Sequence, residues 1–465
     1  MDEQASLASW VERVVGGRVT RVTRLARWRP AWDVDVERDG RVVPLHARGE
    51  RELQIVMPYR IADEVATHDL LEAHGVPVPH AYGVCDEPYA LVMDRLPGHV
   101  DLAGVDDAAR ERLLADYLEI LARVYEIPLG AAAAAGFEVP VDDADVALGG
   151  YWRRMEALYD PLMEHLPADP MAVFLRRWLR DNVPPGRLGA TRFITYDSFQ
   201  FMFEGDRITG LLDFEHAHVG DPMMDLAALR IRDTIKNIGE LSVTASRYEK
   251  ITGIAIDHDV VEYHTVLYNA ISVLSTGPPL LDPVRGTDWL SYLAWYVNGA
   301  RWAFEAIAEI RGYQLDRVAI PESRPSRRAP AFRHLVTGLR GLSTEVDNYE
   351  LTVLGRVANH LKRVDEIGPA LDAADLDDLG RVLGSRPDPA DADAELLHLV
   401  ERAGAEREEE LVRLLDARAQ RMHLAMASPT SLMLRHPRLR SLRVDRPTER
   451  DANDGWPPGA IPGTA

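Results

Sequence analysis

Two acidic residues stand at the two ends of a short apolar hairpin near the middle of the chain. Asp197 and Gln200 precede the apolar run 201–203, and Asp213 follows the apolar run 208–212. The residues between the two runs, Glu-Gly-Asp-Arg, are a tight-turn signal. Because a hairpin brings its ends together, we expect Asp197 and Gln200 to face Asp213.

Two carboxylates and an amide at this spacing suit metal-assisted phosphoryl transfer. In that reaction one carboxylate orients the attacking hydroxyl, while a second carboxylate and an amide carbonyl hold the Mg²⁺ that bridges the phosphates. Asp197 is the candidate catalytic residue for the first role. Asp213 and Gln200 are the candidate metal ligands.

The motifs around this hairpin resemble those of the aminoglycoside phosphotransferase-like family, which has a protein-kinase-like fold. That family carries H-G-D-x-x-x-x-N, a hairpin, D-W-E or D-F-E, and then G-D-P-x-x-D-L-A. The chain has Asp-Phe-Glu at 213–215 and Gly-Asp-Pro-Met-Met-Asp-Leu-Ala at 220–227. The resemblance covers residues 18–312. It implies a kinase that uses ATP, or another nucleoside triphosphate, and Mg²⁺ to transfer a γ-phosphoryl group to a hydroxyl of a small molecule, with the acceptor left open.

The first half of the family pattern is altered in this chain. Thr195 and Tyr196 precede Asp197 where the family has His-Gly, and the loop is two residues shorter, so that Gln200 takes the place of Asn. A Gln amide offers the same carbonyl as Asn on a longer arm. A shorter loop with a longer side chain is therefore compatible with a metal ligand at this position.

The N-terminal part of the chain supplies the candidate nucleotide-binding residues. The resemblance assigns Met93 and Arg95 to the hinge segment that meets adenine, and Glu64 to the helix glutamate that pairs with a lysine on the third strand. The first lysine of the chain is Lys236, so Arg48, near the end of the third strand, is the best replacement. A planar guanidinium is bulkier than an ammonium and not equivalent to it, and the alternative interpretation of Arg48 is an ordinary exposed arginine.

The loop of the first hairpin, residues 27–32, contains no glycine. A phosphate-covering loop normally uses glycine so that backbone N–H groups can approach the phosphates. Either arginine side chains replace those contacts, or the loop binds no anion. Together with the altered catalytic loop and the missing lysine, this supports an alternative function: a catalytically inactive kinase-like module that binds a nucleotide or metabolite and acts through its C-terminal helices.

A metal-hydrolase site is a further alternative. His216 and His218 share one face of a strand and lie close in sequence to Asp213, Glu215 and Asp221. No further histidine stands nearby in the sequence to complete a zinc set. The phosphotransferase interpretation accounts for more residues of the same stretch.

Other acidic residues have simpler interpretations. We expect Asp221 and Asp225 to be structural, because Asp-Pro turns and carboxylates at helix starts are common turn and cap chemistry. Four acidic residues would suit a cationic acceptor, although acidic loops are routine in so anionic a chain: Asp101, Asp142, Asp143 and Asp145.

The apolar periodicity predicts an α+β, two-lobed protein-kinase-like fold that would position these residues. Strand-like alternation over 18–47 predicts an antiparallel meander, helical spacing over 62–74 predicts one helix, and two further strands end at residues 90–93. Mostly helical patterns follow. The order strand, strand, strand, helix, strand, strand is that of a small kinase-like N-lobe, followed here by a helical C-lobe and an additional C-terminal helical region.

The expected domain boundaries follow from these patterns. Three prolines and several charges predict a linker, and a polar, proline- and glycine-rich end predicts a disordered tail. The C-terminal helices either pack on the core or form a homodimer surface. The expected division is a nucleotide-binding N-lobe at 1–97, a helical C-lobe with the catalytic hairpin at 98–316, a linker at 317–330, a helical region at 331–446 and a tail at 447–465.

Composition limits the class of protein. The chain has 465 residues, a hydrophobic content of 46% and a net charge of −21, which argues against a nucleic-acid partner because phosphate backbones select basic surfaces. Cys85 is the single cysteine, which excludes an internal disulfide and fits a reducing compartment. No signal sequence or apolar stretch of about 20 residues is present, so we expect a cytoplasmic protein with no membrane partner.

Overall fold

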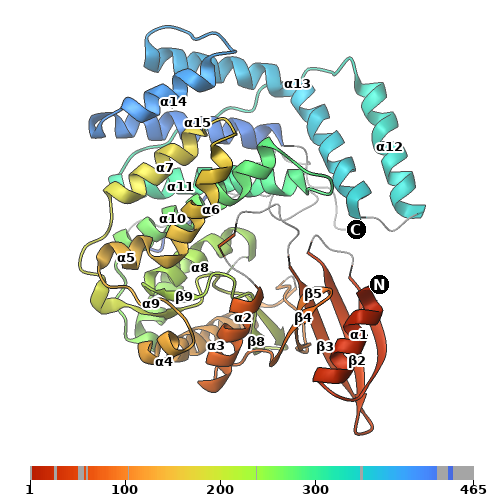
Figure 1. The fold of residues 1–465 in the computed structure, drawn as a ribbon. Coiled ribbons are helices and arrows are strands. Elements are labelled where there is room, and N and C mark those ends of the chain that lie inside the picture. The colour runs from red at the N-terminus through yellow and green to blue at the C-terminus, as the bar shows by residue number, and fades with distance from the viewer. Residues whose placement is uncertain are drawn as a thin grey trace.

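The structure is a computed structural model with three parts, which Figure 1 shows as a strand-rich lobe, a helical lobe and an outer group of C-terminal helices. It describes residues 3–25, 29–50, 57–58, 61–102, 104–236, 238–345, 349–426 and 438–443.

The N-terminal lobe is built on a five-stranded antiparallel sheet in the order β1-β2-β3-β5-β4. Helix α1 (Glu3–Val14) precedes the sheet, and α2 (Ile61–Ala73) connects β3 to β4. The predicted order of strands and helix is therefore confirmed. The strands are β1 (Arg18–Arg24), β2 (Ala31–Arg38), β3 (Arg41–Gly49), β4 (Ala81–Asp86) and β5 (Tyr89–Asp94).

The two faces of this sheet are covered by different helices. On β5, Ala90 and Val92 belong to the apolar cluster that α1 covers, whereas Leu91 and Met93 pack with Ile61 of α2. This alternation is the period of two that a strand imposes on its side chains. It places α2, and the buried Glu64 on it, against the face of the sheet that is turned toward the rest of the chain.

The second lobe is mostly helical and is centred on two long helices. Helices α10 (His258–Leu281) and α11 (Trp289–Arg311) pack against each other, and α10 also contacts α6, α7 and α8. Their residues are buried on nearly all sides because they lie inside the lobe. The surrounding helices are α3 (Asp107–Tyr125), α4 (Leu129–Ala134), α5 (Asp143–Leu148), α6 (Gly150–Met163), α7 (Pro170–Asp181), α8 (Met223–Lys236) and α9 (Leu241–Thr252).

The predicted hairpin is present, and it lies between helices of the N-terminal lobe and helices of the second lobe. Strand β7 (Phe201–Glu204) pairs with β8 (Arg207–Leu211), and Gly205 in the turn has a positive φ of 62°, which glycine adopts at little cost. Strand β6 (Arg192–Ile194) pairs with β9 (His218–Gly220). The chain segments before and after the hairpin are therefore also held together.

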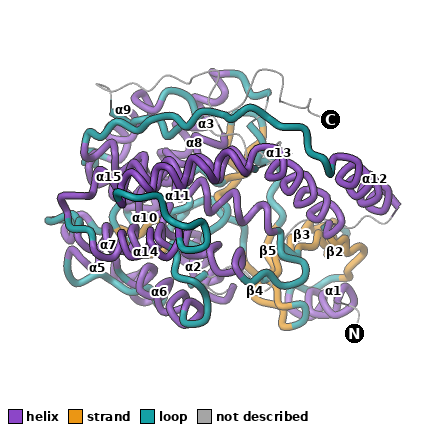
Figure 2. The backbone as a smooth tube through the Cα atoms, turned by 90° about the horizontal axis from the view of Figure 1, so that it is seen from above, coloured by secondary structure: helices purple, strands orange, loops and turns teal. Residues whose placement is uncertain are grey.

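The C-terminal helices form the outer part of the molecule, and Figure 2 shows α12 lying along α13 at its side. Helix α15 packs on α11 and α13, and α14 packs on α7. Leu411 and Leu415 of α15 are buried and belong to the core of the second lobe. These helices are α12 (Ala329–Glu345), α13 (Tyr349–Leu383), α14 (Ala392–Arg402) and α15 (Glu408–Ala425).

The α+β, two-lobed architecture with an additional C-terminal helical region is thus as expected. The domain boundaries and the homodimer surface stay predictions, and the expected disordered tail lies outside the described residues. Among the helices that the structure describes, none combines the length and the apolar character needed to cross a bilayer.

Candidate active site

The three residues predicted at the ends of the hairpin meet around one amide group. The Gln200 Nε2 donates to Asp197 Oδ2 at 3.0 Å and lies 3.3 Å from Asp213 Oδ2. The Leu212 N–H donates to the Gln200 carbonyl at 3.0 Å, which extends the pairing of the hairpin to its open end. The predicted convergence of Asp197, Gln200 and Asp213 is therefore present.

The backbone around these residues is in an unusual conformation. Tyr196, Phe199 and Asp213 have φ values of 57°, 62° and 66°, a left-handed region that costs a non-glycine residue about 1–2 kcal/mol. Tyr196 and Phe199 are fully buried, so packing of their rings holds the loop in this shape. Strain of this kind is kept where the surrounding structure enforces it, and active-site loops are a common location.

Asp225 holds this loop in place through hydrogen bonds. Its carboxylate accepts hydrogen bonds from the Tyr196 N–H at 2.7 Å and from the hydroxyls of Thr195, Tyr125 and Ser198 at 3.0, 3.1 and 3.2 Å. Burial raises the pKa of Asp225 to about 6, against the opposing effect of these hydrogen bonds. Its structural role was expected from the sequence.

Asp221 anchors the turn before α8. Burial opposes its ionisation, but the nearby His264 ring and the hydrogen bonds from Arg187 outweigh that effect and hold the pKa of Asp221 well below the usual value. Arg187 binds it at 2.6 and 3.0 Å, and the Met223 N–H donates to it at 2.9 Å. Asp221 therefore closes the turn and caps the start of α8.

Arg48 is a buried ion-pair partner and not an ordinary surface residue. Its Nη2 lies 2.7 Å from Glu64 Oε1, and its Nη1 lies 2.9 Å from Asp213 Oδ1. The exposed fractions of the Arg48 and Glu64 side chains are 11% and 1%. The pair expected between the third strand and the α2 helix is formed, and the same guanidinium connects that helix to the Asp213 carboxylate.

Arg29, in the loop of the first hairpin, also points into the protein. Arg29 is 2% exposed, donates through Nε to the Gly49 carbonyl at 2.8 Å, and lies 3.2 Å from Glu215 Oε2. Residues 27 and 28 of that loop lie outside the described residues. Arg29 and Arg48 thus face three carboxylates, those of Glu64, Asp213 and Glu215.

The two predicted hinge residues make their contacts within the N-terminal lobe. Met93 is buried in the apolar cluster under α2. Arg95 lies 3.1 Å from Asp33 and 2.8 Å from Asp35 on β2, and its N–H donates to the Pro44 carbonyl at 3.0 Å. Neither side chain joins the cluster around Asp213 through these contacts, and their role in binding adenine stays a prediction.

Helix α8 contributes two cations that the sequence analysis missed. The Arg232 guanidinium donates to Asp197 Oδ1, which also accepts from the Tyr268 hydroxyl at 3.0 Å. The Lys236 Nζ donates to the Phe199 carbonyl at 3.3 Å. A signal was available, because Lys236 is the first lysine of the chain and stands one helical turn after Arg232.

The oxygen donors present fit a Mg²⁺ ion. Asp213 Oδ2 lies 3.3 Å from the Gln200 amide, and Mg²⁺ is commonly bound by one or two carboxylates with water and substrate phosphates completing its shell. The histidine alternative finds no such support. Among the residues that the structure describes, no group of three or more His, Cys, Asp or Glu side chains is arranged to hold a metal.

His218 is instead part of an aromatic cluster. It stacks on Tyr151 at 5.9 Å between ring centroids, and burial lowers its pKa to about 4. His216 lies among the rings of Tyr151, Tyr196 and Tyr268. Both histidines therefore pack behind the catalytic loop.

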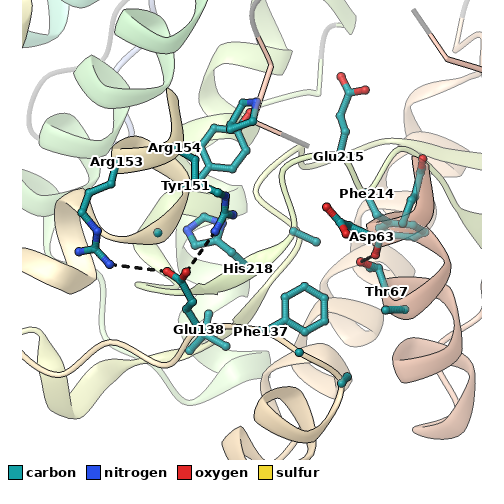
Figure 3. Close-up of a pocket in the computed structure, with 18 of the residues that line it drawn as sticks. Asp63, Thr67, Phe137, Glu138, Tyr151, Arg153, Arg154, Phe214, Glu215 and His218 are labelled. Carbon is teal, nitrogen blue, oxygen red and sulfur yellow. Dashed lines mark hydrogen bonds and ion pairs between the residues drawn. The ribbon is translucent and has the colours of Figure 1, made fainter. Parts of the chain in front are cut away.

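A cavity of about 680 Å³ lies beside this cluster, between α2, α6 and the segment after Asp213. In Figure 3 Arg153 and Arg154 point toward Glu138 on one side, and Asp63 and Glu215 lie on the other. Phe214 in its wall packs edge-on against His68 of α2 at 5.0 Å. The cavity thus adjoins the Arg48–Glu64 pair.

Comparisons with known proteins agree with the motifs. Residues 47–248 match the model of the phosphotransferase enzyme family. No curated protein matches the chain.

Solved structures with overall likeness include three phosphotransferases or kinases. A macrolide 2'-phosphotransferase from Brachybacterium faecium is 19% identical, with 61% of this chain and 99% of that chain covered and a TM-score of 0.39. A choline/ethanolamine kinase family protein from Mesorhizobium loti is 14% identical, with 67% and 94% covered and a TM-score of 0.43. A spectinomycin phosphotransferase in complex with ADP and spectinomycin is 12% identical, with 65% and 98% covered and a TM-score of 0.44.

The family match begins on β3 and ends on α9. It includes Arg48, Glu64, Asp197, Gln200 and Asp213, and it confirms the resemblance that the motifs indicated. The segment of this chain from residue 47 to residue 248 carries the signature of the phosphotransferase enzyme family.

Proposed function

We propose that this protein is an ATP-dependent, Mg²⁺-assisted phosphotransferase that moves a γ-phosphoryl group to a hydroxyl of a small molecule. The observation that carries the proposal is the convergence of Asp197, Gln200 and Asp213 on one amide group. These residues lie within the segment that matches the phosphotransferase enzyme family.

Asp197 would orient the acceptor hydroxyl and take its proton as the new bond to phosphorus forms. Contacts from Gln200 and Tyr268 hold the carboxylate from two directions. A carboxylate fixed in this way loses little further freedom when the acceptor binds, which is how positioning contributes to rate.

Gln200 and Asp213 would hold the metal, which offsets charge on the phosphate oxygens when it is bound. Asp213 Oδ1 is engaged by Arg48, and Oδ2 is the oxygen that faces Gln200. The Gln200 amide would present its carbonyl oxygen to a cation, because O and N of an amide exchange places by a simple flip.

Arg48 and Glu64 would position the nucleotide phosphates, and residues 93–95 would approach the adenine. The Asp94 and Arg95 N–H groups donate to the His80 and Pro44 carbonyls, each at 3.0 Å. We therefore place any adenine contact through a backbone N–H after Arg95.

The acceptor is left open. Asp142 accepts a hydrogen bond from the Asp145 N–H at the start of α5, and Asp143 accepts from the N–H groups of Gly186, Arg187 and Leu188. Structural contacts account for these acidic side chains, so they give no support for a cationic acceptor. The cytoplasmic location and the absence of nucleic-acid and membrane partners stay predictions from composition.

The second candidate is an inactive kinase-like module that binds a nucleotide or metabolite and acts through its C-terminal helices. The observation that favours it is that the protein's own cations already occupy both key carboxylates. Arg48 binds Asp213 and Arg232 binds Asp197. A ligand has to compete with these ion pairs before either carboxylate can serve the reaction.

A thermal-shift series separates the candidates. Magnesium-dependent stabilisation by ATP or GTP, lost in Asp213→Asn, is expected if Asp213 holds the metal, because a ligand that binds only the folded state raises its stability. Asp316→Asn, at a fully exposed side chain, is the matched control.

Phosphate transfer to a panel of alcohols then tests the reaction itself. Transfer to any member supports the phosphotransferase. Stabilisation without transfer to any alcohol of the panel would favour the inactive binding module. If no nucleotide stabilises the protein, both the phosphotransferase and a nucleotide-binding module are contradicted.

A further inference from the structure

Two cations on one face of α8 stand against the catalytic loop. Arg232 and Lys236 are four residues apart and therefore project from the same side of the helix. Arg232 binds the Asp197 carboxylate, and Lys236 donates to the Phe199 carbonyl at 3.3 Å. Both contacts fall on the loop that joins β6 to the hairpin.

The rest of α8 is fixed by buried ion pairs. Arg230 binds Glu262 of α10 and Glu309 of α11. Asp233 accepts two hydrogen bonds from Arg440, at 2.6 and 2.7 Å. Side chains whose charges are paired away from water are costly to displace, so the orientation of α8 is set independently of its contacts with the loop.

Arg440 belongs to the short C-terminal segment 438–443, which contacts α8 at Arg230 and Asp233. Leu442 and Leu439 of this segment are buried in the core of the second lobe. The Leu439 N–H also donates to Glu305 of α11 at 2.8 Å. The segment therefore locks α8 against α11.

Lys236 is half-buried, and few polar groups satisfy its charge. An ammonium has three donors, and within the described part of the chain Lys236 makes one hydrogen bond, to a backbone carbonyl, and lies 5.9 Å from the centre of the Phe201 ring. No carboxylate ion pair with Lys236 occurs among those residues. An ammonium that is partly withdrawn from water in this way is costly unless an anion completes its surroundings.

On the other side of the site, the two described arginines are already paired with carboxylates. Arg29 is paired with Glu215, and Arg48 is shared between Glu64 and Asp213. Phosphoryl transfer nevertheless requires positive charge beside the transferred group. Among the described residues, Arg232 and Lys236 lie next to the Asp197 loop and can supply it.

We propose that Arg232 and Lys236 bind the oxygens of the transferring γ-phosphoryl group, an inference that rests on the proposed function. The acceptor oxygen forms the new bond to phosphorus, the bond from phosphorus to the bridging oxygen breaks, and ADP leaves with that electron pair. The acceptor proton passes to Asp197. Arg232 and Lys236 keep their protons and stabilise the charge on the transferred group.

A consequence concerns Asp197. When the γ-phosphoryl group binds, it attracts Arg232, which now occupies Asp197 Oδ1. That oxygen is then available to the acceptor hydroxyl. The pairing of Arg232 with Asp197 therefore gives way when the correct nucleotide binds.

Calorimetric titration with Mg²⁺-ATP and Mg²⁺-ADP tests the proposal without requiring turnover. Lys236→Met should weaken ATP binding about tenfold, the value of one charge-assisted hydrogen bond, and leave ADP binding within twofold. Lys236→Arg should largely restore ATP binding, and Lys250→Met, at an exposed position on α9, should change neither. Equal effects on ATP and ADP, or no effect on either, would overturn the proposal.

The pH dependence of the unaltered protein provides a second test that does not depend on a variant folding. Burial and then Arg232 lower the pKa of Lys236 to about 8, opposed by Asp197, Asp213 and Asp101. ATP affinity should therefore fall roughly tenfold relative to ADP affinity between pH 8 and pH 9.5, as the ammonium is lost. A constant ratio of the two affinities would contradict the assignment.

The two proposals fail in different ways. If ATP binds more tightly than ADP through Lys236 but no alcohol is phosphorylated, the γ-phosphate contact stands and the catalytic function does not. If phosphate is transferred but Lys236→Met leaves the ratio of ATP to ADP affinity unchanged, the proposed function stands and the proposed role of Arg232 and Lys236 does not.

Discussion

Removal of the Arg48 cation should destabilise the protein strongly. Arg48 lies 2.7 Å from Glu64, 2.9 Å from Asp213 and 3.8 Å from Glu215. In Arg48→Met the Glu64 carboxylate, 1% exposed, loses its ion pair with Arg48 and stays in a place that water does not reach. Breaking a buried ion pair by removing one partner typically costs about 3–5 kcal/mol.

Replacement of the partner residue, Glu64, should destabilise the protein less. In Glu64→Met the guanidinium of Arg48 keeps Asp213 at 2.9 Å, so its charge remains paired. Because the two side chains are in contact, the double variant should be more stable than the sum of the single changes predicts, with a coupling of about 1–3 kcal/mol.

Urea unfolding at pH 7, followed by a signal from the N-terminal lobe, measures the free energy of unfolding of the unaltered protein, the two single variants and the double variant. Arg18→Met is the matched control, because Arg18 pairs with Glu37 on the surface with 72% and 46% of the side chains exposed, and such pairs contribute about 0–1 kcal/mol. A loss below about 1 kcal/mol in Arg48→Met, or strictly additive single changes, would refute the account of this buried network.

Two further predictions concern catalysis and pH. Asp197→Asn should lower turnover on an identified acceptor by roughly 10² or more, the scale of losing a catalytic proton acceptor, and steady-state rates that match the unaltered enzyme would remove Asp197 from the mechanism. Burial, and then Glu305, raises the pKa of Asp416 to about 7 from 3.8. The preference of the folded state for the protonated carboxyl stabilises the protein fully below about pH 4, and that contribution is lost as the pH rises through 7. The difference in unfolding free energy between the unaltered protein and Asp416→Asn should therefore decrease from pH 4 to pH 7.5, and a difference that is constant or increases would contradict the burial of an ionisable Asp416.

Local chemistry was enough to predict the hairpin and its ends. The runs 201–203 and 208–212 and the turn between them dictate pairing by the period of a strand and the preference of glycine for positive φ. The position of Asp197, Gln200 and Asp213 follows from that pairing alone. For the same reason the sheet, with one helix after the third strand, could be predicted from the alternation of apolar residues.

The assignment of Arg95 shows where this reasoning ends. Its place after β5 is local, but its contacts with Asp33 and Asp35 depend on the strand order, which sets which side chains on β2 lie within its reach. Arg29 presents the same case, because nothing near it in the sequence indicates that it turns inward to Glu215.

By itself, the sequence determined the α+β class, the hairpin and the identity of the acidic residues at its ends, because these depend on periodicity and turn chemistry within a few residues. The tertiary structure decided which cation each carboxylate meets. Arg232 and Asp197 are 35 residues apart in the chain, and Arg48 and Asp213 are 165 apart. Ion pairs at such separations depend on how α8 and β3 pack against the catalytic loop, and a Coulomb interaction in a buried site is decided by distances of a few ångströms that no local pattern fixes.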